Sequence, residues 1–356
     1  MNATAHFLIP FDLGLELDFV GEDAKEIFKE VSTRPAHDLT FSGRIFPNAR
    51  ITSHLYKFGI GILQLTIDIE GDMAFMADLS CRAEALSVGK IDIRSWGHSL
   101  VDDLIHRAKK FATHQYEQRL KDIEVFPIFV FEKNAIGTAE SFIHRHRKAF
   151  YGIVAGEPNY DTLSDFVLEQ EKLENFGYYE NELILVKRFG AAIASDEANT
   201  ILKLVRLAFS SYWSLRSYNF LLDKETDEAQ VLMSRLPPYY KFWMMPHRYQ
   251  KFSDEAIAFV KDKMAIVDSL YNVSAHIPHI DSDWHLRTVY KAVEKQFDID
   301  DLYKEVEVKL ERIEGSYNTA RDFLSTNFFI AVEIVLILSL AWMVMDTTLL
   351  YIIAHK

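Results

Sequence analysis

The sequence has little cysteine, a deficit of basic residues and few glycines and prolines, and each shortage excludes a class of protein. Its one cysteine, Cys81, cannot form an intrachain disulfide or a cysteine-based zinc or iron–sulfur site. Lys and Arg number 39 against 52 Asp and Glu, and a net charge of −13 gives nucleic acid no general attraction. With 14 glycines and 9 prolines in 356 residues, collagen-like and low-complexity architectures are excluded. These counts predict a folded protein in a reducing compartment that does not bind nucleic acid.

Nucleotide and nucleophile motifs are also missing. No Walker A loop is present, and the glycine pair Gly59 and Gly61 lacks the third glycine of a dinucleotide fingerprint. The segment from Ser95 to Ser99 is similar to a turn but has no G-x-S-x-G order. We therefore expect no cofactor and no catalytic residues.

Hydrophobic residues make up 49% of the chain, enough for two or three domains with substantial cores. Strand and helix signals alternate at first, with a strand expected over residues 61–69 and a helix over 99–121. From about residue 196 the pattern is helical, over 196–222, 225–235, 253–271 and from 284 onward. The sequence thus predicts an α+β domain over residues 1–190, an all-α helical domain over 191–326 and a C-terminal membrane anchor over 327–356.

Residues 328–345 form an apolar run of membrane-spanning length whose one ionisable group is Glu333. A transmembrane helix is favoured over a buried core helix, because core helices seldom stay apolar on every face for five turns. Lys309, Arg312 and Arg321 precede the run and Lys356 follows it, which predicts a single-pass, tail-anchored protein with its N-terminal bulk in the cytoplasm, or in the matrix of an organelle. A carboxylate in hydrocarbon is costly unless it is paired, so we expect Glu333 to mark a contact with another membrane helix.

A heptad pattern precedes the apolar run. Apolar and aromatic residues recur at spacings of 4 and 3, and the seam that they form includes Val306, Leu310, Ile313, Tyr317 and Leu324. Such a seam is typical of a coiled coil. It pairs either with an identical subunit, giving a homo-oligomer, or with the helix over residues 253–271 of the same chain.

The densest cluster of potential metal ligands is His276, His279, Asp281, Asp283 and His285. Imidazole and carboxylate groups suit zinc, iron or manganese, and an open coordination position would activate water. However, the spacing matches no known metalloenzyme motif. Asp281 or Asp283 is more simply the N-cap of the long helix that follows, where the helix dipole also favours a carboxylate.

Three C-terminal segments resemble the YagE family, which includes the proteins named for being required for meiotic nuclear division. The segment from Asp281 through Trp284 and Leu286 to Tyr290 is similar to an Asp-rich turn and helix of that family, and Asp298 to Lys304 resembles the element that follows. Residues 329–335, with Glu333, are similar to its membrane helix. The resemblance implies an N-terminal α/β domain, a helical C-terminal domain and one membrane helix. Family members in organelles act as membrane-associated organisers, in one case supporting translation, and no catalytic residues are implied.

These observations favour a membrane-anchored, non-enzymatic scaffold or regulatory protein of unspecified pathway. Its expected partners are the lipid bilayer, a second copy through the heptad and membrane helices, and a protein that the sequence does not name. The alternatives are a metal-dependent enzyme that uses the cluster from His276 to His285, and a subunit of a membrane channel or transport complex.

Overall fold

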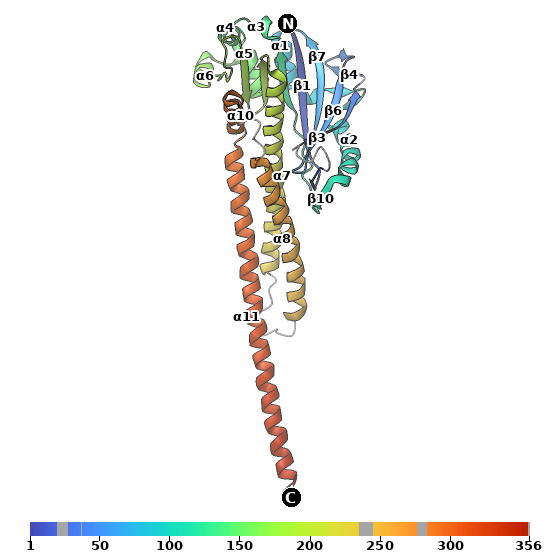
Figure 1. The fold of residues 1–356 in the computed structure, drawn as a ribbon, viewed down its shortest axis with the longest axis vertical. Helices are drawn as coiled ribbons and strands as arrows, with labels where there is room; N and C mark the ends of the chain where they lie inside the picture. Colours follow the sequence, from blue (N-terminus) through green and yellow to red (C-terminus); the bar gives the residue numbers. More distant parts are fainter. Residues whose placement is uncertain (20–27, 37, 235–244, 276–282, 355–356) are drawn as a thin grey trace. The chain divides into compact units, whose positions relative to one another are not determined.

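A computed structural model describes residues 1–19, 28–36, 38–234, 245–275 and 283–354, and the chain divides into two units. Unit 1 comprises Met1–Leu221 and Ala265–Glu305, and unit 2 comprises Leu222–Met264 and Val306–Lys356. The fold class agrees with the sequence: a mixed α+β part comes first, then helices, and last a helix long and apolar enough to span a membrane (Figure 1).

Unit 1 is built on a seven-stranded sheet with the strand order β12-β13-β11-β1-β7-β6-β3. Every neighbouring pair is antiparallel except β11 and β13, which run parallel. The central pair, β1 and β7, is in register over eleven residues, from Asn2 opposite Glu70 to Asp12 opposite Ile60. The strands are β1 (Asn2–Asp12), β3 (Phe28–Pro35), β6 (Arg50–Tyr56), β7 (Ile60–Glu70), β11 (Phe126–Phe131), β12 (Leu183–Lys187) and β13 (Gly190–Ala194).

Two smaller sheets lie beside the seven-stranded sheet in the described residues of unit 1. Strand β2 (Leu15–Leu17) pairs with β10 (Ala112–Gln115), and the other sheet has the order β5-β4-β8-β9. Its strands are β4 (Leu39–Phe41), β5 (Arg44–Phe46), β8 (Ser87–Val88) and β9 (Ile91–Asp92). The expected helix over residues 99–121 is therefore wrong at its C-terminal end, because the chain leaves the helix at Ala108 and adds a strand beside β2.

The turn between β6 and β7 depends on Gly59. Its φ of +77° lies in the left-handed region, and a Cβ placed there would lie 2.3 Å from the carbonyl oxygen of Leu15. This close approach brings the β6–β7 turn against β2, where Leu13 and Leu17 donate backbone hydrogen bonds to the oxygens of Gly59 and Lys57.

One face of the large sheet packs into the main apolar core. Phe7 and Ile9 of β1 lie in one buried cluster with Met76 of α1, Leu104 of α2 and Phe150 of α5. Alternating residues of a strand point to opposite faces, so the other face is left to different helices. The helices of this part of the chain are α1 (Met73–Cys81), α2 (Ile93–Ala108), α3 (Lys133–Ile136), α4 (Ala139–Arg145), α5 (Arg147–Ala155) and α6 (Asp165–Gln170).

The opposite face packs against α7 (Ala198–Ser234) and α10 (Trp284–Gln296). Phe126 of β11 contacts Phe209 of α7, with ring centroids 4.8 Å apart, and Phe297, just after α10, at 5.5 Å. The sheet is thus packed on both faces at β11, which is apolar throughout, whereas β1 and β7 carry polar residues such as Thr4, His6 and Asp68 on this second face.

Unit 2 combines the C-terminal part of α7, much of α8 (Met245–Ala275) and most of α11 (Ile299–Ala354). Phe259 of α8 stacks on Tyr317 of α11, and Lys309 of α11 forms an ion pair with Asp223 of α7 at 2.6 Å. The last part of α11, Val332–Ile353, has a mean hydropathy of 1.9 over 22 residues, and none of it is buried against the rest of the chain.

Candidate functional site

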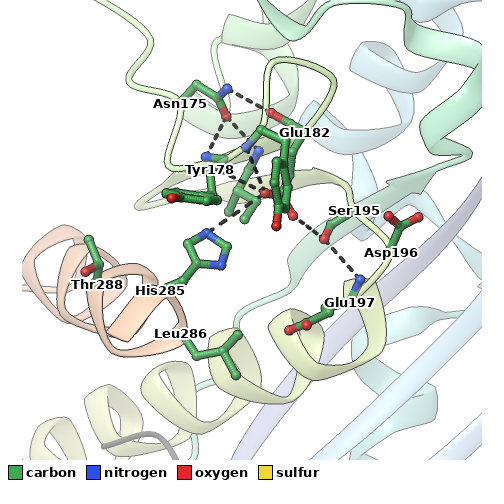
Figure 2. A network of polar contacts seen from close by, with 12 residues as sticks. Asn175, Tyr178, Glu182, Ser195, Asp196, Glu197, His285, Leu286 and Thr288 are labelled. Atoms are coloured by element: carbon green, nitrogen blue, oxygen red, sulfur yellow. Dashed lines mark hydrogen bonds and ion pairs between the residues drawn. The ribbon is translucent and has the colours of Figure 1, made fainter. Parts of the chain in front are cut away.

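Of the polar cluster from His276 to His285, the structure describes Asp283 and His285. His285 lies on the first turn of α10. Its Nε2 atom lies 4.0 Å from Oε2 of Glu182, a buried carboxylate just before β12 (Figure 2). Asp283 is the N-cap of this helix and accepts from the backbone N–H groups of His285 at 2.9 Å and Leu286 at 3.2 Å. The expected capping carboxylate is therefore confirmed at Asp283.

The carboxylate of Glu182 organises the turn that leads into β12. It accepts from the backbone N–H groups of Tyr178 at 2.8 Å and Tyr179 at 3.4 Å, and from the hydroxyl of Ser195. Asn175 braces the same turn, because its Nδ2 donates to the Glu182 carbonyl at 2.9 Å and its Oδ1 accepts from the Ile184 N–H at 2.8 Å. Buried polar groups are stable only when they are hydrogen-bonded in this way.

The order of groups at this site differs from that of a catalytic triad. In a triad the imidazole lies between the nucleophile and the carboxylate, and removes the proton of the hydroxyl. Here the Glu182 carboxylate lies between the two, since Ser195 donates to Oε1 while His285 faces Oε2. The Ser195 Oγ also accepts from the N–H of Glu197 at 3.1 Å, near the start of α7. This arrangement joins the ends of β12, β13, α7 and α10.

Only some of the proposed metal ligands lie within the described residues. His285 is described, whereas His276, His279 and Asp281 lie outside the described residues. Within the described ranges, no group of three or more His, Cys, Asp or Glu side chains is placed to hold a metal ion. The metal site stays a prediction.

Two further polar networks lie in the interior of unit 1, and sequence reasoning missed both. The first is centred on Glu16 of β2, which is 4% exposed. Its Oε1 accepts from the hydroxyls of Tyr116 and Tyr218, each at 2.8 Å, and its Oε2 accepts from Ser269 of α8. Burial raises the pKa of Glu16 to about 8, against the opposing effect of the three hydroxyl donors.

Asp12 extends this region of buried charge. Its two carboxylate oxygens accept from the backbone N–H groups of Gly14 and Leu120, each at 2.8 Å. Burial raises the pKa of Asp12, although both backbone hydrogen bonds favour the ionised form. Asp12 also adds a negative charge near Glu16, which contributes to the raised pKa of Glu16.

The second network is centred on Arg206 of α7, which is 5% exposed. Its Nη1 atom donates to His54 Nε2 at 2.7 Å and to Gln64 Oε1 at 2.8 Å, and its Nε donates to the Tyr56 hydroxyl at 3.1 Å. A guanidinium has only donors, so His54 must accept through Nε2 and be neutral. Burial and the Arg206 charge lower the pKa of His54 to about 3, and burial, aided by Arg50 and Arg206, lowers that of His6 to about 4.

Both networks join residues far apart in the sequence, up to 253 positions for Glu16 and Ser269. One local signal was available for each centre: Glu16 stands between two leucines in a short strand, and Arg206 stands in an apolar stretch of α7. A lone charge among apolar neighbours indicates a buried, paired group, but it does not identify the partners.

The heptad residues lie mostly in the interior of unit 2. Val306, Leu310 and Ile313 are buried and Tyr317 is half-buried, whereas the side chain of Leu324 lies outside the described residues. The contacts of α11 with α7 and α8 are those expected of pairing within the chain. Pairing of this seam with an identical subunit stays a prediction, as does a helix contact at Glu333, which is exposed on α11.

The seam gives a direct test of unit 2. Leu310→Asp should lower the free energy of unfolding by at least about 1.5–3 kcal/mol, because it removes a buried apolar side chain and buries a carboxylate instead. Val308→Asp is the matched control, since Val308 lies on the same helix and is 62% exposed. Denaturant unfolding followed by circular dichroism measures both, and equal midpoints for the two variants would contradict the buried seam.

Searches against family models, curated proteins and solved structures found no match to this chain.

Proposed function

We propose that this protein is a membrane-anchored, non-enzymatic scaffold or regulator that holds the α+β unit at a membrane surface. The observation that carries the proposal is the segment Val332–Ile353 of α11. It is 22 residues long, has a mean hydropathy of 1.9 and is not buried in the chain. A core helix of that composition would be covered by its own protein, whereas a bilayer supplies the apolar surroundings that this segment needs.

The buried polar groups of unit 1 support a role without catalysis. Glu16, Glu182 and Arg206 each hold secondary structure elements together through several hydrogen bonds. Catalytic groups need access to a substrate, and these three side chains are each 5% exposed or less. Their chemistry is used to fix the α+β unit as a rigid body, which is what a scaffold requires.

The charge distribution supports a single pass with the bulk of the protein in the cytoplasm, or in the matrix of an organelle. Lys309, Arg312 and Arg321 precede the span on α11, and Lys356 follows it. Basic residues next to a span favour the non-translocated side. The resemblance to the YagE family implies the same organisation, and we propose membership in that family on the strength of its three C-terminal segments.

Membrane integration and orientation are tested together on membranes from cells that produce the protein. We expect alkaline carbonate to leave the protein in the membrane pellet, because the span is held by apolar contacts that carbonate does not weaken. Protease added from the cytoplasmic side should remove the N-terminal bulk, with detergent-solubilised protein as the control. Release into the carbonate supernatant would contradict the anchor, and protection of the bulk without detergent would exclude a cytoplasmic bulk and leave the matrix orientation.

A further inference from the structure

Helix α8 carries a second apolar stripe that the described part of the chain leaves half-exposed. Ile257, Val260, Met264 and Val267 follow one another at spacings of 3, 4 and 3 along this continuous helix. They are 53%, 47%, 65% and 46% exposed, respectively. This is the spacing of the a and d positions of a heptad, the pattern by which two helices pair.

The stripe is distinct from the face that α8 uses within the chain. The buried residues Phe259, Ile266 and Leu270 lie on another side of the helix, because successive residues are about 100° apart around its axis. Of these, Phe259 stacks on Tyr317 of α11, with ring centroids 5.1 Å apart. The seam of α11 is thus met by one face of α8, and Ile257, Val260 and Met264 line a different face.

We propose that this stripe pairs with the same stripe of a second copy, parallel and in register, when both copies are anchored in one membrane. The inference rests on the proposed membrane anchor. Contacts between Phe259 and Tyr317 and between Lys263 and Glu314 show that α8 and α11 run antiparallel in unit 2. Two copies inserted from the same side therefore present their α8 helices in the same direction.

The charges beside the stripe suit this register. With Ile257 and Met264 at a positions, Lys263 occupies a g position and Asp268 the next e position. Parallel pairing places Lys263 of each copy opposite Asp268 of the other, and Lys261 opposite the neutral Ala256. No like charges face each other between residues 256 and 268. Lys263 also binds Glu314 of its own chain, and an ammonium has three donors, enough for both carboxylates.

The size of the stripe explains why the membrane is needed. Its four half-exposed side chains supply on the order of half of the ~800 Å² that each partner buries in a stable interface. Such a patch pairs weakly between proteins that diffuse freely in solution. Anchoring in a bilayer confines both copies to a thin layer in one orientation, which raises their effective concentration without any new contact.

Disulfide cross-linking of the full-length protein in lipid vesicles tests the pairing. Cys81→Ser removes the native thiol and keeps a donor for the carbonyls of Gly152 and Glu157. In that background, Val260→Cys places a thiol in the stripe, and Val308→Cys is the control at an exposed valine of α11. On mild oxidation at low protein density we expect Val260→Cys to form dimers about tenfold faster than Val308→Cys. Adding Met264→Glu to Val260→Cys should reduce the rate to that of the control, because it places two carboxylates in one layer of the paired helices.

The possible outcomes separate this inference from the proposed function. Equal rates for Val260→Cys and Val308→Cys in protein that floats with the vesicles would overturn the pairing and leave the anchor standing. So would a fast Val260→Cys rate that Met264→Glu does not change, since that thiol would then be reporting a different contact. Protein that fails to float would refute the anchor, and the pairing with it. Circular dichroism melting of each variant checks that it is folded.

Discussion

Deletion of residues 327–356 should release this protein from membranes almost completely and leave unit 1 folded. The deletion removes the whole apolar segment Val332–Ile353 but keeps the buried seam residues Val306, Leu310 and Ile313. The remaining chain stays strongly acidic, so anionic lipid surfaces do not attract it. Vesicle flotation measures the release, and a cooperative thermal transition shows that the soluble product is folded.

A point variant separates loss of the anchor from loss of chain length. Ile337→Asp combined with Leu338→Asp keeps all 356 residues and places two carboxylates inside the segment, where each costs about 2.5–3.5 kcal/mol of insertion free energy. We expect this variant to float less than wild type and to melt as the deletion variant does. Undiminished flotation of the deletion variant would place the membrane affinity in residues 1–326.

The order of element types was predictable from the sequence, and several boundaries were not. The strand expected over residues 61–69 is β7, Ile60–Glu70, because apolar residues alternate there with Gln64, Thr66 and Asp68, which is the period of a strand. Two expected helices, over residues 196–222 and 225–235, are one helix, α7, since Asp223 and Lys224 continue the helix without a cap. The expected continuous helix from Trp284 onward is instead divided at Asp298, whose φ is +51°.

The helix expected over residues 99–121 shows why local periodicity fails at some positions. The helix starts earlier, at Ile93, because Asp92 is its N-cap and accepts from the Ser95 N–H at 2.9 Å. It ends at Ala108, and the segment after it forms β10, which pairs with β2 almost 100 residues earlier. A pairing over that distance leaves no trace in an eleven-residue window, so periodicity extended the helix too far.

The polar networks were beyond sequence reasoning for the same physical reason. The partners of Glu16 come from three separate parts of the chain: Tyr116 after β10, Tyr218 on α7 and Ser269 on α8. Hydroxyl groups of tyrosine and serine are common, and nothing in the sequence marks the ones that meet at a buried carboxylate. In contrast, a cap such as Asp283 acts within three residues, and it was predictable for that reason.

The buried carboxylate of Glu16, the buried His54 and the half-buried His6 should give this fold a maximum of stability at mildly acidic pH. The folded-state pKa of Glu16, about 8, lies above its ordinary value of 4.5, so the stability from its neutral form is complete below pH 4.5 and is lost as the pH rises toward 8. His6 and His54 have folded-state pKa values of about 4 and 3, below 6.5, so their stability is complete above pH 6.5 and is lost as the pH falls. Asp12, with its raised pKa, acts in the same direction as Glu16.

The alkaline side of this profile can be assigned to one residue by substitution. Above about pH 7 the histidines change little, and Glu16 by itself should lower the free energy of unfolding by about 1.4 kcal/mol per pH unit until the pH approaches 8. Glu16→Gln should flatten that decline, because the amide oxygen still accepts from Tyr116 and Tyr218 and has no proton to lose. Urea titration of the anchor-deleted protein at pH 6.5, 7.25 and 8 measures how steeply the free energy of unfolding falls with pH.

Glu117→Gln is the matched control, at an exposed residue beside Tyr116, and should leave that pH dependence unchanged. A Glu16→Gln variant that loses stability with pH as steeply as wild type would show that another group, with Asp12 first among them, takes up the proton on folding.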